Sequence, residues 1–334
     1  MKKIVKQITV VFFCFVFGCF AYDSSSKPVR IIFDTDFGNF PDDLEALILL
    51  NNLENKGLCN VLGIMASCPE RNVIAAIDAV NSFYGNHFEL AVRSRKYYDF
   101  KESHNRPLAT QFTHQITNDD VPLCVEAYRK ILSKQEDHSV VLIVIGRFGN
   151  LKNLLDSEPD QYSSLSGKEL LNKKIRLISD MGGEIPTGKQ EWNFCGKERG
   201  LTKYVLENIR VPIVFNGAEI GRQIQIGAEL NSIDHHTPLY QGLFYFFSHY
   251  PCVKDRFYGE LLDNGTYDSI SVLYAVFGTS QGFWTIVSDG IFQVEENGEC
   301  TWISGVKSNQ SYLKLVPDTA KLKNFILDLL IKKY

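Results

Sequence analysis

The sequence predicts an α/β fold: an open, mainly parallel, Rossmann-like sheet with helices on both faces. Short β-rich runs alternate with amphipathic helical stretches along most of the chain. Runs such as VVLIVI at 140–145 are continuously apolar, as expected of strands that are buried on both faces. The 334-residue chain is 45% hydrophobic and has no composition break after residue 28, which indicates one domain, 29–334, with a sizeable core.

The alternation of apolar runs and helical stretches predicts each element in turn. Candidate strands cover 29–33, 61–66, 89–92, 139–145, 174–179 and 211–215. Candidate helices between them cover 42–54, 70–84, 120–134, 198–208 and 268–276. Two final strands, FWTIVS (283–288) and SYLKLV (311–316), and a closing helix at 319–334 depart from the simple alternation.

The N-terminus has the pattern of an export signal. Three lysines within the first six residues precede a short apolar run, which predicts a signal peptide at 1–21 and a polar tether at 22–28. Cleavage after Ala21 competes with cleavage before Cys19, where VFGC resembles a bacterial lipoprotein box and would leave a lipidated membrane tether. A retained membrane anchor is a third alternative. We expect an exported protein that is periplasmic, lipid-anchored or secreted.

Charge and cysteine usage exclude some partners. The formal net charge is -4, and lysines and arginines are scattered among acids, so no nucleic-acid partner is expected. Six cysteines from Cys59 to Cys300 follow the signal, with no CxxC and no Cys/His cluster at zinc spacing. Disulfides and free buried thiols are both compatible with this count. The oligomeric state, including a homo-oligomer, stays open.

Chemistry is expected where the strands end. In open α/β sheets, ligands bind beyond the carboxyl ends of the strands. Those ends carry Gly-rich turns with acids and amides: FDTDFGNFPDD (33–43), MASCPERN (65–72), IGRFGN (145–150), SDMGGE (179–184) and NGAE (216–219).

The first of these turns concentrates negative charge. Asp34 and Asp36 lie two apart at a strand end, so their side chains point the same way. Asp42 and Asp43 open the next helix, where Asp42 is a candidate N-cap. Capping explains only part of this charge. Four converging carboxylates repel unless they are protonated or bridged by a cation, and such hard oxygen ligands select Ca²⁺ or Mg²⁺.

The segment DTDFGNFPDD resembles the N-terminal signature of the calcium-dependent nucleoside hydrolases, the inosine-uridine preferring ribohydrolase-like family. It fits the longer form DTDxGNDxDD except at Phe40. The resemblance implies that Asp36 and Asp43 ligate calcium and that Asp36 is also the general base on a calcium-bound water. It further implies that Asp42 binds ribose hydroxyls and that Asp34 supports the site from behind.

Two further segments extend the resemblance. VLIVIGRFGNL (141–151) resembles a strand end that finishes in T-N and supplies a backbone carbonyl to calcium, which implies Ile145 as a ligand. Gly149 stands where Thr is usual. LISDMGGEIPTGKQEWNF (177–194) resembles an MGG strand end followed by E-F-N. By this likeness Glu191 and Asn193 hold sugar hydroxyls and Trp192 is a stacking wall. The alternatives are an ordinary turn and a plain core aromatic.

GTYDSISVLYAV (265–276) resembles the family's C-terminal H-D-x-x-A-V-x-Y segment, which implies Asp268 as the remaining calcium carboxylate. Capping of the helix that follows is the alternative for Asp268. Tyr267 replaces the histidine that precedes this aspartate in better-known members. Because tyrosine is a weaker acid, Tyr267 is a candidate catalytic hydrogen-bond donor to the departing base, with stacking aromatics or a different substrate as alternatives.

The resemblance covers roughly residues 29–316, in four segments in the family's order. It implies that a nucleoside or related N-riboside is hydrolysed to ribose and free base, with Ca²⁺ as cofactor. One alternative is an exported, non-catalytic, calcium-dependent nucleoside- or sugar-binding protein. Another is a haloacid-dehalogenase-like phosphatase with Asp34 as nucleophile, which expects a hydroxyl residue where Gly38 stands.

Overall fold

The computed structural model describes residues 27–196 and 198–334 and confirms the predicted fold class. Within these residues a central sheet of eight strands runs in the order β10-β13-β7-β5-β4-β1-β2-β3. All neighbours are parallel except β10 and β13, which are antiparallel. The predicted signal segment 1–21, with Cys19, and most of the tether 22–28 lie outside the described residues.

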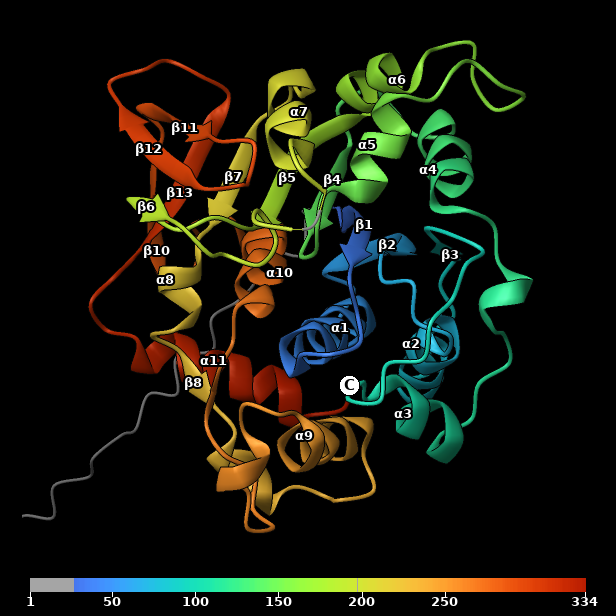
Figure 1. Cartoon of the computed structure of the whole chain (residues 1–334), viewed down its shortest axis with the longest axis vertical. Helices are drawn as coiled ribbons and strands as arrows, with labels where there is room; N and C mark the ends of the chain where they lie inside the picture. The colour runs from blue at the N-terminus through green and yellow to red at the C-terminus, as the bar shows by residue number, and fades with distance from the viewer. Residues whose placement is uncertain (1–26, 197) are drawn as a thin grey trace, which may run out of the picture.

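The six strands predicted for the alternating part of the chain all belong to this sheet (Figure 1). The central sheet comprises β1 (Val29–Thr35), β2 (Cys59–Ala66), β3 (Leu90–Val92), β4 (Val140–Val144), β5 (Ile175–Met181), β7 (Ile213–Asn216), β10 (Trp284–Val287) and β13 (Gln310–Leu315). Side chains of one strand alternate between two cores. In β1, Ile31 and Phe33 join one hydrophobic cluster and Ile32 joins the other, as the continuous apolar run requires.

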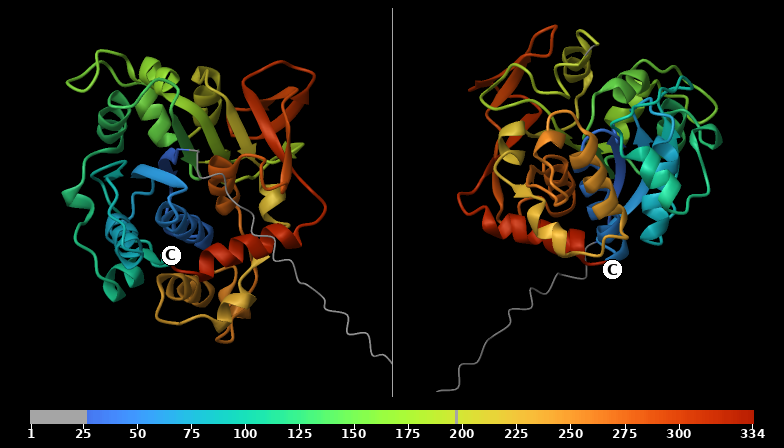
Figure 2. Two further views of the ribbon diagram at one scale, coloured as in Figure 1. Left: turned by 180° about the vertical axis from the view of Figure 1, so that it is seen from behind. Right: turned by 60° about the horizontal axis from the view of Figure 1, so that its bottom comes forward.

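Helices cover both faces of the sheet. One face carries α1 (Pro41–Asn55), α2 (Val73–Phe83), α3 (Asn105–Gln111), α9 (Pro238–His249), α10 (Asp268–Phe277) and α11 (Ala320–Ile331). The other face carries α4 (Cys124–Ser133), α5 (Gly149–Leu155), α6 (Gly167–Lys174) and α7 (Leu201–Asn208). The closing helix α11 packs against α1, and the views of Figure 2 show it crossing the lower part of the molecule.

Smaller elements surround the carboxyl edge of the sheet. They are the short helix α8 (Ala218–Gly221), the sheet of β11 (Gly290–Val294), β12 (Cys300–Ser304) and β6 (Thr187–Gly188), and the pair β8 (Gln225–Ile226) with β9 (Asn264–Gly265). Short 3-10 turns lie at Asn118–Asp120, Ala228–Ser232 and Lys254–Arg256. The β11–β12 hairpin was not predicted.

Some predicted boundaries are wrong for identifiable reasons. The helix predicted at 120–134 begins only at Cys124, because Leu123 forms a bridge with Val92 beside the sheet. The helix predicted at 198–208 begins at Leu201, after Gly200 adopts the left-handed conformation. The six cysteines from Cys59 to Cys300 are free thiols, so the disulfide alternative is not seen. Among the described helices, none combines the length and the apolar character that crossing a bilayer requires.

Candidate active site

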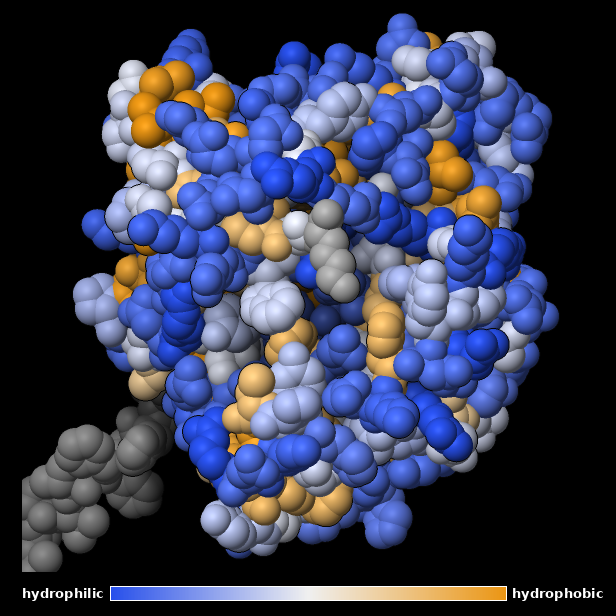
Figure 3. Space-filling model, viewed as in Figure 1, coloured by the Kyte–Doolittle hydropathy of each residue, from blue (hydrophilic) through white to orange (hydrophobic). Residues whose placement is uncertain are grey.

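A cavity of about 1490 Å³ opens at the carboxyl edge of the parallel strands. The face presented in Figure 1 is hollowed near its centre, as the space-filling view shows (Figure 3). Every residue predicted for catalysis, substrate binding or metal ligation lines this cavity: Asp36, Asp42, Asp43, Ile145, Glu191, Trp192, Asn193, Tyr267 and Asp268. Four segments far apart in sequence therefore meet at one place.

The carboxylates of Asp42, Asp43 and Asp268 form a compact group at the starts of two helices. One oxygen from each lies within 4.8 Å of those of the other two. Neither predicted cap is present. Phe40 is the N-cap of α1 and Tyr267 is that of α10, so the capping interpretations of Asp42 and Asp268 are wrong. Pro41 begins α1 because its fixed φ suits the first helical position. The carboxylates of both acids are thus available to a ligand.

Asp36 and Ile145 lie beside this group rather than within it. Gly146 follows Ile145, and a side chain there would come within 2.8 Å of the Asp36 nitrogen, so the glycine permits the two strand ends to approach. The Ile145 carbonyl accepts a hydrogen bond from Asn193 Nδ2 at 3.1 Å. A carbonyl oxygen has a second lone pair, which stays available to a cation.

Burial, and in three of the four acids also the neighbouring carboxylates, raises the pKa of the acids in the cavity. Burial raises the pKa of Asp36 to about 6 and that of Asp42 to about 7, and the charge of Asp36 adds to the rise at Asp42. Burial, then the charges of Asp36 and Asp42, raise the pKa of Asp43 well above its usual range. The pKa of Asp268 rises in the same way, first through burial and then through Asp42. The charged forms therefore need a compensating positive charge.

This donor set fits a hard divalent cation. Among the described residues, no lysine, arginine or histidine forms an ion pair with Asp42, Asp43 or Asp268. Three carboxylates without a cationic side chain, next to a backbone carbonyl, match the oxygen ligands that Ca²⁺ and Mg²⁺ prefer. The residues present are therefore suited to hold a metal ion.

Asp34 is the anchor beneath the site. It is fully buried, and its oxygens accept hydrogen bonds from Tyr128 Oη at 2.6 Å and Asn150 Nδ2 at 3.1 Å. Thr35, next to it, donates its hydroxyl to Asp43 and accepts the Phe37 N–H at 3.1 Å. The end of β1 is thereby tied to α4, α5 and the turn that leads to α1.

Glu191 organises the loop that covers the site. Both of its oxygens accept backbone N–H groups at 2.9 Å, from Gly183 and Phe194 to one oxygen and from Asn193 to the other. Burial raises the pKa of Glu191, and these hydrogen bonds oppose the rise. Asn193 Nδ2 also donates to the Met181 carbonyl at 2.9 Å. An ordinary turn, the alternative for this segment, does not account for these contacts, because the Glu191 side chain connects the end of β5 to residues 193 and 194.

An aromatic rim borders the cavity. Trp192 is 66% exposed, so the core-aromatic alternative is wrong. Its ring lies 6.0 Å from that of Phe40, which also contacts Tyr250 at 5.1 Å and Phe246 at 6.2 Å between ring centroids. Phe40, the departure from the family signature, is thus the centre of this rim. Flat, partly exposed aromatic faces of this kind can stack on a planar base.

The Tyr267 ring is held between two glycines. A side chain at Gly221 would come within 2.2 Å of Tyr267 Cδ1, and one at Gly265 would come within 2.9 Å of its Oη. Burial raises the pKa of Tyr267, so its hydroxyl is protonated at neutral pH and can donate a hydrogen bond. Among the described residues that line the cavity, none is a histidine.

Several residues of the cavity were not predicted. Arg93 and Arg147 line it, and the Arg93 guanidinium lies where a side chain at Gly149 would be, 2.3 Å from its Cζ. A threonine, usual at that position, would therefore require the Arg93 guanidinium to move. Asp180 is buried behind the cavity, and neither of its oxygens has a hydrogen-bond partner. The sequence did indicate functional residues in the strand end SDMGGE, which contains Asp180. It did not indicate which acid of that segment is buried, because this depends on packing.

Comparisons with known proteins identify the fold. No protein-family model matches the chain, and no curated protein matches its sequence. A purine-preferring ribonucleoside hydrolase from Gardnerella vaginalis matches with a TM-score of 0.63 at 14% identity, over 90% of this chain and 98% of that one. An inosine-uridine preferring nucleoside hydrolase from Bacillus anthracis matches with a TM-score of 0.60 at 13% identity, over 92% and 100%.

A third solved structure is the type III effector XopQ in complex with adenosine diphosphate ribose, which matches with a TM-score of 0.62 at 15% identity, over 92% and 94%. At such identities the likeness establishes the fold. The chain has the nucleoside hydrolase fold, and the fold implied by its sequence is confirmed. The phosphatase alternative receives no support from these structures.

We expect Tyr128→Phe to lower the free energy of unfolding by about 1 to 3 kcal/mol, because it removes a donor from the fully buried Asp34 carboxylate. Urea denaturation measures the change. Tyr258→Phe is the matched control, since the Tyr258 side chain is 91% exposed. Equal stability of the two variants would contradict the anchoring role of Asp34.

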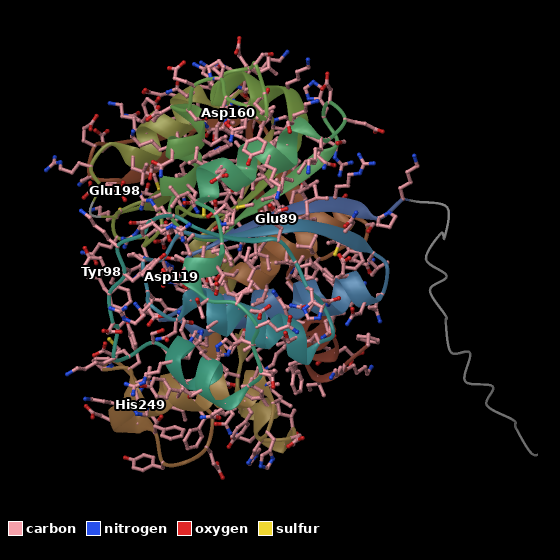
Figure 4. The ribbon with its side chains drawn as sticks, turned by 90° about the vertical axis from the view of Figure 1, so that its right-hand side faces the viewer. Glu89, Tyr98, Asp119, Asp160, Glu198 and His249 are labelled. Carbon is pink, nitrogen blue, oxygen red and sulfur yellow. The ribbon has the colours of Figure 1, made fainter. Side chains whose placement is uncertain are left out.

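Calcium is expected to stabilise the folded protein, by about 2.7 kcal/mol when its concentration is 100 times the dissociation constant. Thermal unfolding with calcium and with a chelator measures this. Asp268→Asn removes one of three mutually repelling carboxylates, so it should lose the calcium response while losing no stability in chelator. The control is Asp119→Asn, an exposed acid on the flank seen in Figure 4. A full calcium response in Asp268→Asn would show that the cation binds elsewhere.

Proposed function

We propose that this protein hydrolyses the N-glycosidic bond of a nucleoside or related N-riboside, giving ribose and the free base, with Ca²⁺ as its cofactor. The observation that carries the proposal is the meeting of four separate sequence segments around one cavity, beside carboxylates suited to a hard cation. The fold supports the same class of enzyme. The two hydrolases compared above are named for purine-preferring and for inosine-uridine preferring activity, which are reactions of this class.

The residues divide between the cation and the sugar. Asp43, Asp268 and the Ile145 carbonyl would hold the cation, with Asp36 beside them. When bound, a divalent cation would lower the pKa of a coordinated water and orient ribose hydroxyls. Asp42, which lies in the same carboxylate group, is proposed to hold these hydroxyls where cation and sugar meet.

Asp36 is the proposed general base. It takes a proton from the water that attacks the anomeric carbon, while the C–N bond breaks and the ribosyl ring becomes positively charged. The surrounding carboxylates stabilise that positive charge, which develops only in the transition state. Asn193 and Glu191 are proposed to hold sugar hydroxyls, and Glu191 also positions Asn193 through the backbone hydrogen bonds of the loop.

The departing base has a different environment from the sugar. Trp192 and Phe40 are proposed to stack on it, and the Tyr267 hydroxyl is proposed to donate a hydrogen bond as it leaves. No histidine among the described cavity residues supplies this proton. Tyrosine thus provides a weaker acid at this position than an imidazolium does.

Binding without turnover is the second candidate function. The structure of XopQ holds adenosine diphosphate ribose, which shows that a protein of this fold can capture a ribosyl compound. The departures at Tyr267 and Gly149 favour the same possibility here. Calcium-dependent binding of a nucleoside without release of ribose would support this candidate.

Asp36→Asn is expected to lower kcat by about 10²- to 10⁴-fold, because the variant has no base to accept the proton from water. Ribose release from a panel of nucleosides, with calcium and with a chelator, measures the loss. Asp119→Asn is the control of equal charge change. A cooperative thermal unfolding transition of Asp36→Asn, measured in chelator beside the wild type, checks that the variant still folds. Activity within tenfold of wild type would remove Asp36 from the role of base.

Tyr267→Phe is expected to lower kcat/KM for inosine by about 5- to 10-fold, the effect of one hydrogen bond. With p-nitrophenyl riboside the effect should be smaller, because nitrophenolate leaves without a proton. Tyr258→Phe, on the exposed surface, should leave kcat/KM unchanged for both substrates. An equal loss with both substrates would mean that Tyr267 does not assist the leaving group.

A further inference from the structure

Cationic side chains line the same cavity as the acids. They are Arg93, Arg147, Lys189 and Arg222. Two of these are neutralised within the protein. Arg93 pairs with both oxygens of Glu198, at 2.8 and 2.9 Å, and Glu198 lies along the edge seen in Figure 4. Arg222 pairs with Glu184 at 2.8 Å.

Arg147 has no such partner. Over residues 27–196 and 198–334, no carboxylate lies within 4.0 Å of its guanidinium nitrogens. Glu198 feels the charge of Arg147, but its own pair is with Arg93. Lys189, exposed on the covering loop, also has no acidic partner among the described residues. Among the described residues, the cavity thus contains cationic groups without an ion-pair partner as well as carboxylates without one.

The Arg147 side chain is held in place. Its Nε donates to the Trp192 carbonyl at 3.2 Å. A side chain at Gly196 would come within 2.9 Å of Arg147 Cδ and Nε, so the arginine packs directly on that glycine. The two Nη groups, which form the outer fork of the guanidinium, make no hydrogen bond to the described residues. A guanidinium that is held in place and has two free Nη groups can donate two parallel hydrogen bonds to the oxygens of an anionic group.

The position of Arg147 creates an electrostatic problem for the proposed reaction. Gly146, the residue before it, lies directly against Asp36, since a side chain there would come within 2.9 Å of Asp36 Cβ, so the positive charge of Arg147 stands close to the proposed base. It therefore also acts on a ribosyl ring that becomes positive in the transition state, and this repulsion opposes the reaction. An anion on the substrate, bound to Arg147, would remove the repulsion.

We propose that the substrate is an N-riboside that carries a phosphate on its 5′ carbon, and that Arg147 binds this phosphate. The inference rests on the proposed function. Arg147 is attached to the loop that presents Trp192 and Asn193, so the phosphate lies next to the groups that hold the sugar. The cavity of about 1490 Å³ exceeds the usual upper size of about 1,000 Å³ for small-molecule sites, which leaves room for the phosphate.

The first test uses the unmodified protein with calcium. It compares kcat/KM for inosine with that for inosine 5′-monophosphate, and for uridine with that for uridine 5′-monophosphate. We expect the phosphorylated member of each pair to be preferred by about 10- to 100-fold, the effect of charge-assisted hydrogen bonds to a guanidinium. Ribose 5-phosphate must appear as the product. Equal rates, or a preference for the nucleosides, would overturn the inference and leave the proposed function intact.

The second test uses Arg147→Ala and Arg147→Lys. Arg147→Ala should abolish the preference for the phosphorylated substrate, and Arg147→Lys should restore part of it, because lysine keeps the charge without the fork. Arg176→Ala is the control, since Arg176 is exposed at the amino end of β5, at the opposite edge of the sheet. A preference that survives in Arg147→Ala would remove Arg147 from the phosphate site.

A third measurement separates this inference from the proposed function. Calorimetry compares the binding of ribose 5-phosphate and of ribose to the calcium-loaded protein and to Arg147→Ala. If no riboside is cleaved, the proposed hydrolysis fails. Tighter binding of ribose 5-phosphate that depends on Arg147 still supports the phosphate site, whereas equal binding of both sugars overturns it.

Discussion

Mutual repulsion among the carboxylates that line one cavity is the constraint on which the rest of this structure depends. Asp42, Asp43 and Asp268 come from the starts of two helices, and the sheet holds both starts in place. Asn216, at the end of β7, donates to the Tyr267 carbonyl at 2.6 Å and so fixes the start of α10. The fold therefore opposes a repulsion that a bound cation relieves, which makes ligand binding and stability two aspects of the same geometry.

Close approach of the strand ends needs positions without side chains. Gly146 lets the end of β4 approach Asp36, and Gly149 makes room for the Arg93 guanidinium. Gly221 does the same for the Tyr267 ring. These glycines follow strands or precede turns, as many glycines do, but here each contacts a residue of the cavity. The departure at Gly149 is consequently linked to Arg93, because a larger residue at 149 would require the Arg93 guanidinium to move.

The sequence predicts the central architecture because burial on both faces produces uninterrupted apolar runs, as in 140–145. It predicts the cavity residues because strand order brings the carboxyl ends together. It does not predict the short half-exposed strands β11 and β12, in which the alternation of apolar and polar residues is weak. It also misplaces Asp42 as a cap, since helix starts depend on Pro41. Arg147 and Asp180 were missed because ion pairing and burial between distant segments are tertiary properties.

The two sides of the cavity differ in how closely they follow the family pattern. The acids that are proposed to face a cation and a sugar stand at the positions that the resemblance implies. Of the residues that differ, Phe40 belongs to the aromatic rim, Gly149 lies against Arg93, and Tyr267 lies against Gly221 and Gly265. Loss of an acid at Phe40 removes negative charge and adds an aromatic face, while Arg147 adds an unpaired cation. In the proposed reaction the transition-state charge would develop on the sugar, so the acids there could stay unchanged while residues that contact the rest of the substrate alter selectivity.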